Sequence, residues 1–179
     1  MNKGIFKSRW FQILIISLFA ISMAYLETAV VVYLRALFKI VGEYQQIHLD
    51  PKDVLIALPF FAFLQPHYLL TILPEPRILG IELFREIATL LMLLTFAWLV
   101  GKTYKEKLAV FLYSFGLWDI FYYLFLYLLL GWPSSLKTLD VLFLIPVPWV
   151  APVFIPVSIS LGMILIALLL LKLERTGNE

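Results

Sequence analysis

The chain of 179 residues is 63% hydrophobic and only 15% charged, and its mean hydropathy is +0.96. Because a soluble domain is about 45–50% apolar, this composition predicts an integral membrane protein. The net charge of +2 gives no support for a nucleic-acid partner. The chain has no cysteine, which excludes disulfides, thiolate metal sites and cysteine nucleophiles.

The first predicted span covers residues 10–38. The basic residues Lys3, Lys7 and Arg9 precede it and imitate a signal peptide, but the apolar run is too long for a signal sequence. We therefore expect a retained transmembrane helix. Glu27 and Arg35 lie in its second half, two helical turns apart on the same side.

The second predicted span, residues 78–100, carries three charged side chains in its first part. At helical spacing Glu82, Arg85 and Glu86 share one face with Thr89. A charge in hydrocarbon costs about 2.5–3.5 kcal/mol on insertion scales, so these groups require partners. The rest of the chain is interpreted as a shell around this charged face.

Two further spans are predicted at residues 108–130 and 157–173. The first of them carries one charge, Asp119, at its middle. With about 20 residues needed for each crossing, four spans leave no separate soluble domain, and residues 1–179 form one polytopic membrane domain.

Two apolar stretches, residues 54–73 and 141–156, are interrupted by prolines. Proline removes a helix hydrogen bond and clashes with the preceding turn, so neither stretch is expected to span as a regular helix. The first is long enough to be considered as a fifth span. Its prolines are Pro59 and Pro66, and those of the second are Pro146, Pro148, Pro152 and Pro156.

The distribution of Lys and Arg favours four spans over five. With four spans, eight basic residues lie on the side of the termini and four on the other, whereas five spans give five inside and seven outside. We expect the protein in the inner or plasma membrane with both termini cytoplasmic. The eight are Lys3, Lys7, Arg9, Lys102, Lys105, Lys107, Lys172 and Arg175, and the four are Lys39, Lys52, Arg77 and Lys137.

This topology predicts an all-α fold, a four-helix transmembrane bundle whose proline-broken segments form re-entrant or interfacial caps on the outer side. Non-helical backbone at membrane depth is tolerated only when protein or a wet cavity surrounds it. The order of span, outer loop, broken segment and span occurs twice, in residues 10–100 and 108–173, although no repeat is visible at the level of residues.

The same topology brings six charged residues into the central-to-outer half of the membrane, where we expect a ligand-binding site. Four carboxylates against two arginines leave a charge of −2 if all ionise. The surplus is explained by protonated carboxylates, by a bound cation, or by a cationic or polar ligand. The alternative is a purely structural set of ion pairs that holds the bundle together. The six residues are Glu27, Arg35, Glu82, Arg85, Glu86 and Asp119.

A divalent metal is one form of the bound cation. Carboxylate oxygens suit Mg²⁺, Ca²⁺ or Mn²⁺, and an added imidazole suits Fe or Zn. The candidate ligands are Glu27, Glu86, Asp119 and His67. A transmembrane b-type haem is not expected, because no histidine lies within the four spans to serve as its axial ligand.

No residue is assigned a catalytic role, because the chain has no phosphate-binding glycine loop, HExxH or ExxH motif. The leading hypothesis is a small multi-pass protein that binds a cation or small polar ligand in the bilayer, with enzymatic turnover left open. The first alternative is a non-catalytic subunit or assembly factor of a larger membrane complex. The second is a small ion- or proton-coupled transporter, which would need a homodimer.

Overall fold

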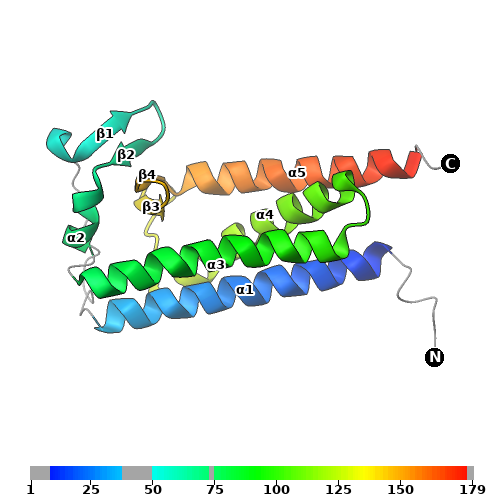
Figure 1. The fold of residues 1–179 in the computed structure, drawn as a ribbon, viewed down its shortest axis with the longest axis horizontal. Coiled ribbons are helices and arrows are strands. Elements are labelled where there is room, and N and C mark those ends of the chain that lie inside the picture. Colours follow the sequence, from blue (N-terminus) through cyan, green and yellow to red (C-terminus); the bar gives the residue numbers. More distant parts are fainter. Residues whose placement is uncertain (1–8, 38–49, 73–74, 177–179) are drawn as a thin grey trace.

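Four long helices run along a common axis, and a small β-sheet lies at one end of them (Figure 1). The computed structural model describes residues 9–37, 50–72 and 75–176; the predicted positions Lys3, Lys7, Phe38, Lys39 and Leu73 lie outside these ranges. Each long helix is long and apolar enough to cross a membrane, as the sequence predicted. The helices are α1 (Arg9–Leu37), α3 (Pro76–Val100), α4 (Tyr104–Leu130) and α5 (Phe154–Thr176).

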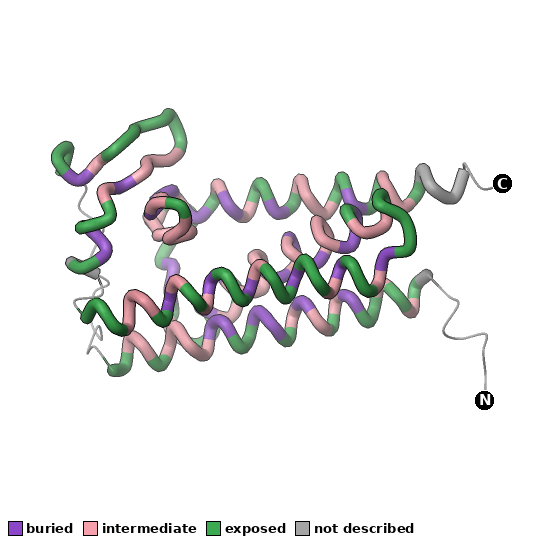
Figure 2. Tube along the Cα trace, viewed as in Figure 1, coloured by how far each residue is buried: buried purple, intermediate pink, exposed green. Residues whose placement is uncertain are grey.

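Helix α4 is the central helix of the bundle, since α1, α3 and α5 all pack against it. A core of Ala20, Met23, Ala24, Leu93 and Trp118 joins α1, α3 and α4. Much of the outward surface of α3 and α5 is exposed (Figure 2). In a bilayer, lipid chains would cover these apolar faces.

The turn between α3 and α4 is fixed by local chemistry. Thr103 is the N-cap of α4, and its side chain accepts a hydrogen bond from the N–H of Glu106 at 3.1 Å. The Glu106 carboxylate accepts from the N–H of Lys102 at 2.8 Å, a variant of the capping box. At Gly101 an added Cβ would lie 2.5 Å from the backbone nitrogen of Lys107, so the close approach requires glycine.

The sheet corrects the all-α expectation. Its four strands lie in the order β1-β2-β4-β3, and every neighbouring pair is antiparallel. Each proline-broken segment supplies one hairpin, and Ala62 of one hairpin pairs with Val150 of the other. The strands are β1 (Val54–Ala57), β2 (Ala62–Leu64), β3 (Leu139–Phe143) and β4 (Trp149–Pro152).

Residues 54–72 form strands and short helical turns, and no fifth spanning helix is present there. The chain enters β1 through the 3₁₀ turn η2 (Pro51–Asp53) and leaves β2 through η3 (Pro66–Tyr68) and α2 (Leu69–Ile72). Proline at the first position of each 3₁₀ turn lacks the N–H that would be left unpaired there. These prolines therefore begin the short turns that flank the β1–β2 hairpin, and they do not kink a helix.

The sheet has its own small core of Leu64, Tyr68 and Val150. The ring of Trp149 also packs against those of Phe63 and Phe143, with centroids 5.9 Å and 5.5 Å apart. We call this end of the bundle, where α1 ends and α3 begins, the sheet end. The start of α1 and the end of α5 lie together at the opposite end (Figure 1).

Candidate functional site

An arginine on α3 lies between carboxylates of two helices. The Nη1 atom of Arg85 contacts Oε2 of Glu27 on α1. Its Nε and Nη2 atoms donate to Oε2 of Glu82, one turn earlier on α3, at 2.9 Å and 2.8 Å. The guanidinium thus directs two N–H groups to the Glu82 carboxylate and a third to the Glu27 carboxylate.

Helix geometry places these groups together. Residues three or four apart lie over one another, so Glu82, Glu86 and Thr89 form the buried side of α3, with relative exposures of 5%, 9% and 3%. Thr89 donates its hydroxyl to Oε1 of Glu27, which is itself 7% exposed. We call Glu27, Glu82, Arg85, Glu86 and Thr89 the arginine–carboxylate cluster.

Glu86 connects this cluster to the sheet. Its two carboxylate oxygens accept the backbone N–H groups of Leu144 at 2.8 Å and Ile145 at 3.2 Å, just after β3. It also lies within electrostatic range of Arg85 and Glu82. A charged acceptor is an effective partner for buried backbone donors, so Glu86 holds the β3–β4 connection against α3.

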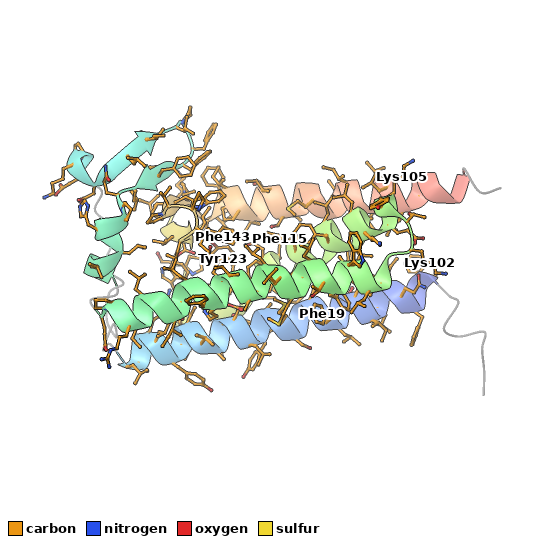
Figure 3. The ribbon with its side chains drawn as sticks, viewed as in Figure 1. Phe19, Lys102, Lys105, Phe115, Tyr123 and Phe143 are labelled. Carbon is orange, nitrogen blue, oxygen red and sulfur yellow. The ribbon has the colours of Figure 1, made fainter. Side chains whose placement is uncertain are left out.

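A second polar group lies near the sheet end and was only partly predicted. Asp140 of β3 accepts a hydrogen bond from the Tyr123 hydroxyl at 2.9 Å. Arg35 places its guanidinium 4.6 Å from the ring centroid of Trp132, a cation–π distance, and interacts electrostatically with Asp140. We call Arg35, Tyr123, Trp132 and Asp140 the Asp140 group. Figure 3 shows Tyr123 toward the sheet end, far from Lys102 and Lys105.

The environment of Asp140 changes its titration. Burial raises the pKa of its carboxyl to about 6, and the hydrogen bond from Tyr123 and the charge of Arg35 partly oppose this rise. Asp140 directly precedes the predicted proline-broken stretch 141–156, and the sequence gave no signal of its burial. Its only hint was its position directly before an apolar run.

Tyr122 lies between the two polar groups. Its side chain interacts electrostatically with Arg35, Arg85, Asp119 and Asp140, and its backbone carbonyl accepts a hydrogen bond from Thr28 at 3.3 Å. Charged side chains of α1, α3, α4 and β3 near the sheet end therefore lie within electrostatic range of this one ring, and together we call them the polar region.

Asp119 faces α5 and has a different partner from the cluster. Its Oδ2 accepts the hydroxyl hydrogen of Ser160 at 2.7 Å. This hydrogen bond joins α4 to α5. Of the six predicted ligand residues, the structure joins Glu27, Glu82, Arg85 and Glu86, and places Arg35 and Asp119 nearby with other partners.

The four candidate metal ligands are held by separate neighbours. His67 lies in η3, where its Nε2 is 3.2 Å from Oδ1 of Asp53. Within residues 9–37, 50–72 and 75–176, no three His, Cys, Asp or Glu side chains form a group that could hold a metal ion. A metal would therefore need a rearrangement of the carboxylates described above.

Carboxylates outnumber arginines in this polar region. With Asp140 added, five acidic side chains (Glu27, Glu82, Glu86, Asp119 and Asp140) accompany Arg35 and Arg85. Around Arg85 alone there are three carboxylates. Buried charges are costly unless they are compensated, so the surplus of carboxylates requires either bound protons or a positively charged partner.

Arg85 also reaches the surface of the bundle. Its side chain is 28% exposed and lines an open groove on α3 together with Arg77, Gly80, Ile81, Phe84 and Ala88. Three of its N–H groups serve Glu27 and Glu82. Arg85 is thus the member of the arginine–carboxylate cluster that lines this open groove.

No protein-family model, curated protein or solved structure matches this chain.

Proposed function

We propose that the chain is a membrane protein that binds a cation, or a small cationic solute, at the arginine–carboxylate cluster. One observation carries the proposal: two buried carboxylates, Glu27 and Glu82, contact one guanidinium, and a third buried carboxylate, Glu86, lies within its electrostatic range. If all ionise, this cluster holds a charge of −2. Charged groups within a membrane span are expensive and are functional by default.

The geometry favours a singly charged or hydrogen-bonding cation over a chelated divalent metal. The carboxylates already bind Arg85, Thr89 and two backbone N–H groups. Oε2 of Glu82 already accepts two N–H groups, but its Oε1 and the second lone pairs of the Glu27 and Glu86 oxygens remain, so an ammonium-type donor or an alkali cation can be added without displacing these partners. A divalent ion demands several converging oxygens, and this grouping is missing from the described part of the chain.

The orientation that we propose places the sheet end on the outer side of the membrane and both termini in the cytoplasm. The support is the excess of Lys and Arg expected on the side of the termini. The sheet would then lie in the interfacial region, and the cluster in the outer half of the bilayer. A ligand would reach it from the outside.

The test is a stability screen of the purified protein in mild detergent. The chlorides of Li⁺, Na⁺, K⁺, Mg²⁺, Ca²⁺, Mn²⁺ and Zn²⁺ and of methylamine are added singly, at constant ionic strength, and thermal unfolding is followed. A ligand present at 100 times its Kd stabilises the folded state by about 2.7 kcal/mol. Plasma mass spectrometry of the same protein detects a metal that is retained through purification.

Two variants make the screen specific. Glu86→Gln removes a charge from the cluster and keeps an oxygen acceptor, whereas Glu75→Gln removes an exposed carboxylate before α3. We expect one cation to stabilise the wild type and Glu75→Gln but to lose its effect in Glu86→Gln. Equal responses of all three proteins to every cation would reject the proposal.

A second role, a non-catalytic subunit or assembly factor, is favoured by another observation. Arg85 and Glu86 already have partners inside the chain, as expected of groups that hold a scaffold together. Such a protein should co-purify with a stoichiometric membrane partner after mild solubilisation. In that case the cation screen would show no specific ligand.

A further inference from the structure

The hairpin formed by β1 and β2 has an apolar surface that is exposed in the described part of the chain. Residues 55–60 are six consecutive exposed positions, all of them apolar. The side chains of Leu55, Ile56, Leu58 and Phe60 have relative exposures of 45–63%. From residue 54 to residue 74 the chain has no Asp, Glu, Lys or Arg. Water is therefore a poor environment for the whole hairpin.

The exposed side chains of β1 do not alternate with buried ones, as they would in a strand with one covered face. Successive side chains of a strand point to opposite faces, and a partner protein lying on one face would leave exposed residues only at every second position. In β1 three successive residues are exposed, with the pattern intermediate, exposed, exposed, exposed. A medium that surrounds both faces fits this pattern better than a second protein surface.

The position of the hairpin identifies that medium. Figure 1 shows β1 and β2 projecting sideways from the bundle, beyond α5. In a membrane-embedded bundle this direction lies along the bilayer plane. We infer that the β1–β2 turn, residues 57–61, inserts into the lipid interface of the same leaflet that surrounds the sheet end.

The backbone of the turn is suited to a shallow depth. Pro59 has no N–H, and the N–H of Leu58 donates to the carbonyl of Phe61 at 2.9 Å. Among the described residues, however, no strand pairs with the outer edge of β1. An open sheet edge cannot enter hydrocarbon, because its N–H and C=O groups would lack partners. The turn therefore inserts, while the edge of β1 remains at the level of the hydrated headgroups.

This inference rests on the proposed membrane embedding and is independent of what the polar site binds. Because the chain has no cysteine, single nitroxide labels can be attached without background. The labelled positions are Phe60→Cys and Leu58→Cys in the turn, Leu91→Cys on the exposed face of α3 as the lipid reference, and Lys52→Cys as the water reference. The full chain is reconstituted into vesicles of phosphatidylcholine and phosphatidylglycerol.

Power-saturation electron paramagnetic resonance measures collisions of each label with oxygen, which concentrates in lipid, and with a water-soluble nickel chelate. We expect the oxygen-to-nickel ratio at residues 58 and 60 to be severalfold above that at residue 52 and to approach that at residue 91. A ratio equal to that at residue 52 would overturn the inference, because the turn would lie in water. Protection from both reagents would overturn it too, because protein would cover the turn.

The label at residue 91 tests the membrane embedding of the bundle separately from the insertion of the β1–β2 turn. A lipid-like ratio at residue 91 with a water-like ratio at residue 60 rejects the inserted turn alone. A water-like ratio at residue 91 rejects the membrane embedding of the bundle, and with it both proposals. Agreement between residues 58 and 60 excludes an effect of one substitution on folding.

Discussion

Arg85 on α3 and Glu27 on α1 form an ion pair across the interface between two helices that are separated in the sequence by a hairpin. Farther toward the opposite end of the bundle, the same two helices meet at Phe19 and Phe96, whose rings stack with centroids 3.9 Å apart. One contact is charged and lies nearer the sheet end, and the other is aromatic. Together they hold α3 against α1 at two levels.

The first prediction concerns the loss of the Arg85 charge. In Arg85→Met the carboxylates of Glu27 and Glu82 remain buried without their counter-ion. Removal of one partner from a buried ion pair costs about 3–5 kcal/mol, and we expect the free energy of unfolding in mixed detergent micelles to fall by that amount. Arg77→Met, at an exposed arginine of the same groove, is the matched control. Equal losses in the two variants would show that the ion pair contributes nothing.

The second prediction concerns the contact between Glu86 and the β3–β4 connection. Glu86→Ala removes the acceptor of the N–H groups of Leu144 and Ile145. We expect faster hydrogen–deuterium exchange of these two amides, and a stability loss of about 1–3 kcal/mol for the unsatisfied donors. Glu75→Ala should leave both exchange rates unchanged. Unchanged protection in Glu86→Ala would mean that the sheet is held by other contacts.

The third prediction concerns the packing of α4 on α5. At Gly116 an added Cβ would lie 2.7 Å from the carbonyl oxygen of Ser160 and 2.8 Å from Cγ1 of Ile164. Gly116→Ala should therefore push the helices apart and lower stability by about 1–3 kcal/mol. At Gly162, on α5, nothing lies within 4 Å of the added atom, so Gly162→Ala should stabilise by about 0.5–1 kcal/mol. Thermal unfolding in detergent distinguishes the opposite signs.

The fourth prediction concerns pH. Burial raises the pKa of Asp140 from 3.8 to about 6, so between these values the folded protein holds more protons than the unfolded chain. The contribution of Asp140 to stability is therefore full below about pH 4 and is lost as the pH rises through about 6. A shift of this size corresponds to at most about 3 kcal/mol.

Unfolding measured from pH 4 to pH 7 checks this expectation by comparison of variants. Asp140→Asn should show a smaller fall in stability with rising pH than the wild type. Asp50→Asn, at an exposed carboxylate, should follow the wild type. If Asp140→Asn and the wild type have the same slope, Asp140 titrates as an ordinary carboxyl.

The helices could be predicted because their signals are local. Each is an uninterrupted apolar run. The start of α4 was predicted at residue 108 but lies at Tyr104, because Thr103 and Glu106 form the N-terminal cap there. The sheet gave no comparable signal. Its central pairing joins Ala62 to Val150, and the apolar residues of both hairpins do not alternate with polar ones. Prolines correctly indicated broken helix but did not indicate strand.

The sequence indicated which residues belong to the polar site, but it indicated few of the contacts between them. The spacing of Glu82, Glu86 and Thr89 fixed their common face on α3, and the need for a partner on another helix is met by Arg85 and Glu27. Arg35 was predicted on the same side of the first helix as Glu27 and in the same site. Its guanidinium lies over Trp132 instead, because the chain after α4 returns to the end of α1. That return depends on the tertiary fold and has no signature in the sequence near Arg35.

The strand order has a consequence for the chain as two fragments. The turn after α3 separates a first part with α1, the β1–β2 hairpin and α3 from a second part with α4, the β3–β4 hairpin and α5. Each hairpin offers its second strand to the other across the middle of the sheet, and α4 packs against helices of the first part. A chain cut at Gly101 and produced as two polypeptides should therefore reassemble, because pairing of β2 with β4 aligns the two parts.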